Sequence, residues 1–155
     1  MDERFSLTLA SLQDHWDRQQ HMRLAPGLSA AEIADFERRN AVKLPEDFAA
    51  YLELANGFRD TGAWEDCDDD AFQFYPLRDE HLVHDGYLKF CEWTMSMDGY
   101  AICVDPEGPV GTVVMLYGNG LSGVLAGSFT EFTLLYLSGD SALYRGAPAH
   151  PLPTP

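Results

Sequence analysis

The chain has 155 residues and a mass of 17.3 kDa, which suits one domain with a single hydrophobic core. Its 25 acidic and 10 basic residues give a formal net charge of -15, so we expect it to repel nucleic acid and anionic membranes and to attract cationic partners. It lacks an apolar run of the roughly 18 residues that span a bilayer, and its acidic start, Met1 to Arg4, is unlike a signal peptide.

The first predicted helix lies near the N-terminus. Its apolar residues recur at the spacing of one helical face, and polar residues fall on the other faces. Pro26-Gly27 then breaks the chain. The predicted inward-facing residues of this helix are Phe5, Leu9, Leu12 and Trp16.

A capping box predicts the start of the second helix. In this motif the Ser29 side chain accepts a hydrogen bond from the N–H of Glu32, and the Glu32 carboxylate accepts one from the N–H of Ser29. Leu28 and Ile33 form a hydrophobic staple across the same helix start. We therefore expect Leu28, Ile33 and Phe36 to be buried.

A third predicted helix follows Leu44-Pro45. Proline suits the first helical turn because an N–H there has no partner within the helix. Asn56-Gly57 predicts the end of this helix, since glycine readily adopts the left-handed conformation. The predicted apolar face comprises Phe48, Tyr51, Leu52 and Ala55.

The middle of the chain predicts strands separated by turns. Turn-forming residues stand at 97–99 and 105–109, between runs rich in strand-forming residues. The run at 110–117 is apolar enough for a central strand buried on both faces. The predicted strands cover 72–75, 87–93, 100–104, 110–117 and a short one at 124–126.

A second capping box, Ser128 with Glu131, predicts a closing helix that ends at Gly139. The order of elements predicts an α+β fold in which N-terminal helices pack on a largely antiparallel, twisted sheet with a closing C-terminal helix. We expect one domain over residues 1–145 and an extended, proline-rich tail over 146–155. The closing helix directs inward Phe129, Phe132, Leu135 and Tyr136.

The three cysteines, Cys67, Cys91 and Cys103, are odd in number and unmatched in spacing. They predict reduced thiols and a cytoplasmic location rather than a disulfide framework. Cys91 and Cys103 fall within predicted strands, where we expect them to pack as small apolar side chains. The lack of a C-x-x-C pair argues against a structural zinc site.

An ordered set of motifs resembles the SUKH superfamily, which includes fungal cell-wall assembly regulators and many bacterial immunity proteins. The resemblance covers residues 12–138. Two positions depart from the family pattern: Asn40-Ala41 stands where a glycine usually precedes Leu-Pro, and Phe58 stands where a second glycine often follows Asn-Gly. Asn40 tolerates the left-handed conformation, so we expect the first turn to survive. The matching residues are Trp16, Pro26-Gly27-Leu28-Ser29, Glu32-Ile33, Phe36-Glu37, Leu44-Pro45, Asp47-Phe48, Tyr51-Leu52, Asn56-Gly57, Gly108-Pro109-Val110 and the helix at 129–137.

The resemblance implies a fold and a protein-binding role. The family motif is structural, because its residues set helix ends and fill the core, and family members commonly bind a toxin domain and inhibit it. We therefore expect a non-enzymatic immunity protein whose partner is a cognate toxin domain, basic enough to complement the charge of -15. A scaffold or regulatory adaptor with the same fold is the alternative, and a small metal-dependent enzyme is a third hypothesis.

Residues 60–85 hold nine acidic residues and one basic residue, Arg78. The run from Glu65 to Asp70 cannot be desolvated without opposite charge, so we expect it to face solvent and to dock a basic protein. Trp64 and Trp93 stand near acidic residues, where an exposed aromatic ring could anchor a partner. A solvated loop and a Ca²⁺ site are the alternatives, although the run lacks the spacing of an EF-hand. The predicted partner-binding residues are Asp60, Trp64, Glu65, Asp66, Asp68, Asp69, Asp70, Glu80 and Trp93.

Three further motifs match chemical sites only in part. His81 and His84 with Asp85 are zinc-ligand types without a clear fourth ligand, so loop histidines are favoured. The segment 118–123 matches G-x-G-x-x-G, but no helix follows it, which favours a glycine-rich hairpin turn. The segment 139–143 resembles a nucleophilic-serine motif but follows a C-terminal helix, which favours a helix stop. We therefore expect no catalytic residue, no bound metal and no cofactor.

Overall fold

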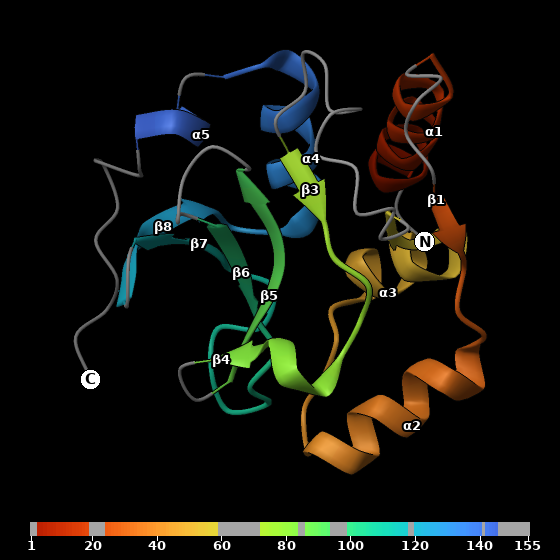
Figure 1. The fold of residues 1–155 in the computed structure, drawn as a ribbon, viewed down its shortest axis with the longest axis vertical. Coiled ribbons are helices and arrows are strands. Elements are labelled where there is room, and N and C mark those ends of the chain that lie inside the picture. The colour runs from red at the N-terminus through yellow and green to blue at the C-terminus, as the bar shows by residue number, and fades with distance from the viewer. Residues whose placement is uncertain are drawn as a thin grey trace.

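The computed structural model describes residues 3–18, 24–58, 72–83, 86–93, 99–117, 120–140 and 142–145 (Figure 1). The helices are α1 (Glu3–Arg18), α2 (Ala30–Asn40), α3 (Glu46–Leu54), the 3-10 helix η2 (Asp79–His81), α4 (Phe129–Ser138) and α5 (Ala142–Arg145). The strands are β1 (Leu24–Pro26), β2 (Ala55–Phe58), β3 (Phe72–Phe74), β4 (Leu82–Val83), β5 (Tyr87–Trp93), β6 (Gly99–Cys103), β7 (Val113–Tyr117) and β8 (Gly120–Ala126).

The main sheet has the strand order β3-β5-β6-β7-β8, with β4 also paired to β5. Each of these pairs is antiparallel, and β1 and β2 form a separate antiparallel pair. The main sheet lies on one side of the molecule, while α1, α2 and α3 lie on the other (Figure 1). This arrangement confirms the predicted α+β class with a C-terminal helix. Among the described helices, none is long and apolar enough to span a bilayer.

The core lies between the helices and the sheet and is rich in aromatic rings. Trp16 of α1 is buried, and its Nε1 donates a 3.0 Å hydrogen bond to the hydroxyl of Tyr136 in α4. Its ring centroid lies 5.1 Å from that of Phe74 in β3 and 6.0 Å from that of Tyr51 in α3. The indole therefore fills apolar space and also has a partner for its N–H, as a buried tryptophan requires.

The start of α2 confirms the predicted capping box. Ser29 Oγ accepts from the Glu32 N–H at 3.1 Å, and the Glu32 carboxylate accepts from the Ser29 N–H at 3.2 Å. Ile33 and Phe36 are buried as predicted, but Leu28 is only half-buried. Leu28 lies just outside the helix, where its N–H donates to the carbonyl oxygen of Leu52 at the end of α3.

The turn after α2 forms as expected, but its left-handed residue is Ala41, with φ of 53°, rather than Asn40. Asn40 remains helical, and its side-chain amide donates to the carbonyl oxygen of Phe36 and to Asp79. These two bonds explain why the turn forms one residue later than predicted.

The helix α3 ends at Leu54, not at Asn56-Gly57 as predicted, and that motif lies within β2. Gly57 has φ of +70°, and a Cβ placed on it would lie 2.6 Å from the carbonyl carbon of Tyr75. A glycine is needed there because β2 approaches the backbone that follows β3 more closely than a side chain allows.

Two strand boundaries differ from prediction. β7 begins at Val113 rather than Val110, because Gly111 turns the chain and its N–H donates to the carbonyl oxygen of Cys103. β8 begins at Gly120, which pairs with Tyr117 and confirms the predicted hairpin at 118–123. Residues 113–116 are buried, as expected for a central strand.

The second capping box is only half confirmed. Ser128 Oγ accepts from the Glu131 N–H at 3.1 Å, but the Glu131 carboxylate accepts from the N–H of Gly127. Phe129, Phe132 and Tyr136 are buried, Leu135 is half-buried, and Gly139 ends the helix in the left-handed conformation. Cys91 and Cys103 are buried in the core, as predicted for small apolar side chains. Cys67, the turn at 97–98 and the tail at 146–155 lie outside the described residues.

Candidate partner-binding surface

The structure describes Glu80 and the backbone of Trp93 among the nine predicted partner-binding residues. Glu80 lies in η2, is exposed, and approaches Arg78 at 3.5 Å. Trp93 ends β5 opposite Phe72, the first residue of β3. The acidic segment, by which we mean Asp60 to Asp70, ends two residues before Phe72, so sheet pairing places Trp93 beside the strand into which this segment leads. The other seven predicted residues lie in the acidic segment and therefore outside the described residues.

The chain on both sides of the acidic segment is fixed to one aromatic cluster. Phe58, which precedes the segment, stacks on Phe74, which follows it, with ring centroids 5.5 Å apart. Both rings also contact Trp16, at 5.2 and 5.1 Å between centroids. The described residues on the two sides of this interval are therefore held together in the core through Phe58 and Phe74.

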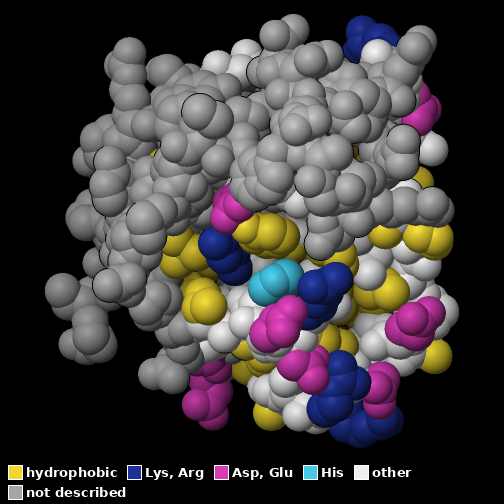
Figure 2. Space-filling view, in the orientation of Figure 1, with side chains coloured by type: hydrophobic (Ala, Val, Ile, Leu, Met, Phe, Trp, Pro, Cys, Tyr) yellow, Lys and Arg dark blue, Asp and Glu magenta, His cyan; other side chains and the backbone are white. Residues whose placement is uncertain are grey.

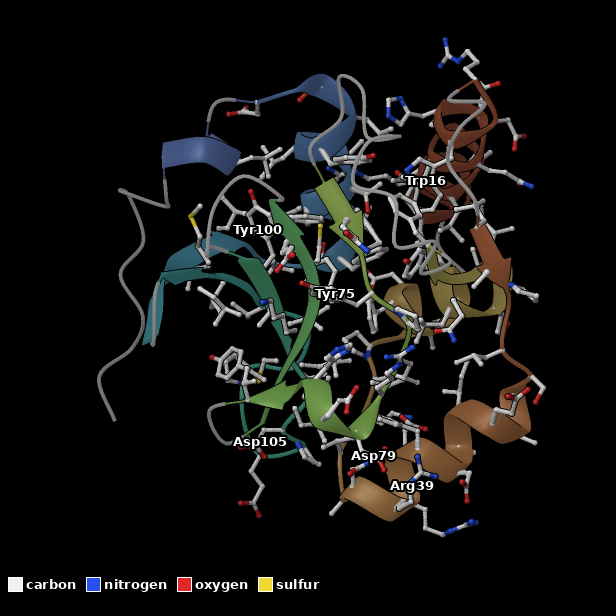
Figure 3. The ribbon with its side chains drawn as sticks, viewed as in Figure 1. Trp16, Arg39, Tyr75, Asp79, Tyr100 and Asp105 are labelled. Carbon is white, nitrogen blue, oxygen red and sulfur yellow. The ribbon has the colours of Figure 1, made fainter. Side chains whose placement is uncertain are left out.

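The helix η2, which carries Glu80, is attached to the end of α2 (Figure 3). The Nε and Nη2 atoms of Arg39 donate to the two carboxylate oxygens of Asp79 at 3.0 and 2.8 Å. Asn40 Nδ2 donates to the same carboxylate at 3.1 Å. The hydrogen bonds from Arg39 and then from Asn40 hold the pKa of Asp79 below its usual value. All three side chains thus fix η2 through contacts at the surface.

A cluster that sequence analysis missed lies beside η2 on the outward side of β3 and β5. The ring of Tyr75 lies 4.8 Å from that of His81, and Lys89 Nζ lies 5.4 Å from the centroid of the Tyr75 ring. Lys89 Nζ also pairs with Glu92 at 3.3 Å, and both of these side chains are largely shielded, at 24% and 18% exposed. Figure 2 shows Lys or Arg and Asp or Glu side chains around a histidine on this face.

The protonation states of this cluster follow from its partial burial. Burial raises the pKa of Tyr75 above its usual range, and a hydrogen bond with Glu92 raises it further. Burial also lowers the pKa of His81, although a 3.2 Å contact between His81 Nδ1 and the carbonyl oxygen of Pro76 opposes this shift. At neutral pH the cluster therefore presents a protonated tyrosine and a neutral histidine.

A bulge in β5 brings Lys89 and Glu92 together. Lys89 pairs with Ala101 and Cys91 pairs with Tyr100, so one extra residue stands in β5 between these two pairs. Residues three apart on a regular strand point to opposite faces, but a bulge changes that alternation and places these two side chains on one face. The signal in the sequence is Gly99, where a Cβ would lie 2.8 Å from Lys89 Cε, because glycine in a strand often marks a close approach.

The described part of this surface combines aromatic, polar and charged side chains. Within the described ranges, no group of three His, Cys, Asp or Glu side chains could hold a metal ion. His81 packs on Tyr75, while His84 and Asp85, its predicted companions in a zinc site, lie outside these ranges. What the surface offers is aromatic area, hydrogen-bonding groups and mixed charge, which is the composition of many protein interfaces.

A comparison with protein families identifies the chain. The family model described as SMI1 / KNR4 family (SUKH-1) matches residues 27–134, well over half of the sequence. The chain belongs to this family. Proteins of the SUKH-1 family generally serve in immunity or in cell-wall regulation and act as binding modules. Among curated proteins, no sequence matches this one.

The SUKH-1 match includes most of the structural motif described above. It contains Gly27, whose backbone lies against the end of α3, and the Asn56-Gly57 pair, which contacts the segment before η2. The helix α1 precedes the matched range, although its Trp16 fills the centre of the core. The family motif therefore contributes Asn56, which bonds the segment before η2, and Trp16, which contacts both Phe58 and Phe74.

Proposed function

We propose that this SUKH-1 protein is a cytoplasmic immunity protein that binds a cognate toxin domain and covers its basic active-site or substrate-binding surface. The observation that carries this proposal is that the described chain on each side of the acidic segment is anchored in the core, through the stacking of Phe58 on Phe74. Fixed ends reduce the conformational entropy that a binding segment loses when it docks. The five acidic residues between Glu65 and Asp70 then supply a concentrated negative charge for a basic partner.

The proposed docking surface comprises the acidic segment, Glu80, Trp93 and the neighbouring Tyr75 and His81. Charges of this kind act mainly on the association rate and its dependence on salt. Aromatic side chains at the centre of an interface act mainly on dissociation, because they bury area and exclude water. Trp64 and Trp93 are the proposed anchors, and the acidic residues provide the steering.

The experiment is a measurement of association and dissociation rates with the toxin domain encoded beside this gene, at 50 and 500 mM NaCl. Replacing Asp66, Asp68, Asp69 and Asp70 by Asn should slow association about tenfold at low salt and flatten its salt dependence. Trp64→Ala should instead speed dissociation. A matched control removes four exposed acidic charges elsewhere, through Glu3→Gln, Asp17→Asn, Glu53→Gln and Glu107→Gln.

The control decides between a local and a global effect of charge. An association rate that falls equally in both four-residue variants would mean that net charge alone steers the partner. An unchanged rate in the Asn variant would place docking elsewhere. The scaffold or adaptor alternative is tested in cells that express the toxin: an immunity protein restores growth, whereas an adaptor binds without protecting.

A further inference from the structure

The helices α1 and α4 pack against each other, and a groove of about 560 Å³ lies between them. Its apolar walls are formed by Leu7 of α1 and by Leu134 and Leu137 of α4. Leu7 is 63% exposed and Leu134 is 37% exposed, and these are two of the three exposed large hydrophobic residues in the described ranges. Two of them in one groove form a patch that water solvates poorly.

The middle of α1 also lacks the charge that the solvated side of a helix normally carries. Residues 5–13 contain no acidic or basic side chain, although the chain as a whole has one charged residue in about every four. The exposed side chains of this stretch are Ser6, Leu7, Ala10, Ser11 and Gln13. A solvent-facing side of an amphipathic helix is usually charged or strongly polar, so this one is suited to a contact.

Charge decides which partner suits the groove. Among the described residues that line it, Glu3 and Arg4, adjacent on the first turn of α1, are the charged ones, and their charges cancel. A basic partner is attracted to acidic surfaces, and this groove offers it no electrostatic attraction. A second copy of this chain, itself at -15, is repelled by most of the surface and can approach closely only where the local charge is near zero. A two-fold contact would also let Glu3 and Arg4 of one copy complement those of the other.

We propose that the α1–α4 groove binds a second copy of this chain, with Leu7 of each copy inserted into the groove of the other. The helix α1 has 16 residues and is about 24 Å long, so two such faces bury less area than the roughly 1,600 Å² of a standard interface. The dimer is therefore weak and depends on concentration. Figure 1 places α1 away from β4 and from the neighbouring η2, which carries Glu80.

The test is sedimentation velocity of the full chain from 5 to 500 µM, at 0.15 and 1 M NaCl. The average mass should rise from 17.3 kDa toward twice that value with concentration. The rise should be steeper at 1 M NaCl, because the Debye length falls to about 3 Å and the repulsion between the copies is screened. Leu7→Glu should weaken dimerisation at least tenfold, and Leu134→Glu should do so from the other wall of the groove.

The matched control is Leu54→Glu, the same substitution at the third exposed leucine, which lies at the end of α3 outside the groove. This variant should dimerise like the parent. The proposal is overturned if the parent stays at 17.3 kDa at 500 µM, if 1 M NaCl weakens the dimer, or if Leu54→Glu is as damaging as Leu7→Glu. Melting curves report whether each variant folds, and Leu134→Glu decides the outcome if Leu7→Glu does not.

Discussion

Asn56 Oδ1 accepts a 2.8 Å hydrogen bond from the backbone N–H of Leu77, 21 residues later in the chain. Asn56 begins the Asn-Gly motif in β2, and Leu77 lies two residues before η2. The bond therefore holds the segment that carries Glu80 against the helical half of the molecule. A motif residue positions the candidate surface without forming part of it.

Replacing Asn56 by Ala should lower the free energy of unfolding by about 1–3 kcal/mol, because the partly buried N–H of Leu77 loses its acceptor. Urea denaturation measures this change. Asn40→Ala is the matched control, since the long-range bond of Asn40, to Asp79, lies at the exposed surface, and this variant should destabilise less. An equal decrease in unfolding free energy in the two variants would contradict the role assigned to Asn56.

Gly27→Ala should destabilise the protein by several kcal/mol or prevent folding. A Cβ at this position would lie 1.9 Å from the carbonyl oxygen of Glu53, a clash with backbone that cannot move away cheaply. Gly139 offers the comparison, because it has φ of +66° but no atom within 4 Å of its added Cβ. Gly139→Ala should therefore lower the free energy of unfolding by only about 1–2 kcal/mol, the penalty for holding alanine in the left-handed conformation. Thermal unfolding that ranks the two variants in the opposite order would contradict this explanation.

Ser29→Ala should lower the free energy of unfolding by about 0.5–2 kcal/mol, because α2 loses the oxygen that accepts a hydrogen bond from the Glu32 N–H. The control is Ser6→Ala, an exposed serine inside α1, where alanine is the better helix former and stability should hold or rise slightly. Thermal denaturation of both variants measures the difference. A melting temperature of Ser29→Ala equal to that of the parent would mean that the cap contributes nothing to stability.

Stability should fall as the pH is lowered from 7 to 5, and His81 should account for part of the loss. Burial lowers the pKa of His81 in the folded state, so below about 6.5 the unfolded chain binds a proton that the folded protein does not. Arg78 and Lys89 add to this shift, whereas the Pro76 carbonyl and Glu80 oppose it. In His81→Gln the difference in unfolding free energy between pH 7 and pH 5 should be smaller than in the parent. An unchanged difference would show that His81 titrates alike in both states.

Local patterns predicted the elements whose signals are contained within a few residues. The cap at Ser29 and the strand at 87–93 match the structure because each depends on nearby residues and on hydrophobic alternation. The strand β1 was not predicted, since it has three residues and forms only by pairing with β2 some 30 residues later. The position of Gly57 depends in the same way on its distant contact with Tyr75.

The candidate surface was predicted only where charge or aromatic character was visible in the sequence. Glu80 and Trp93 were identified for that reason, although the structure leaves their role in binding as a prediction. The pairing of Lys89 with Glu92 was missed because it depends on the extra residue in β5. Phe90-Cys91 does not mark that bulge, and the signal that exists, Gly99, lies on the neighbouring strand. Tyr75 and His81 come together only when β3 and η2 fold against β5.

The stacking of Phe58 on Phe74 has an evolutionary consequence. Because the core fixes both rings, the interval from 59 to 71 closes a loop whose ends do not depend on what lies between them. Doubling the length of such a loop costs only about 0.6 kcal/mol of closure entropy. Insertions, deletions and wholesale exchange of these residues should therefore be tolerated, so that one framework can acquire a new partner through a single graft between Phe58 and Phe72.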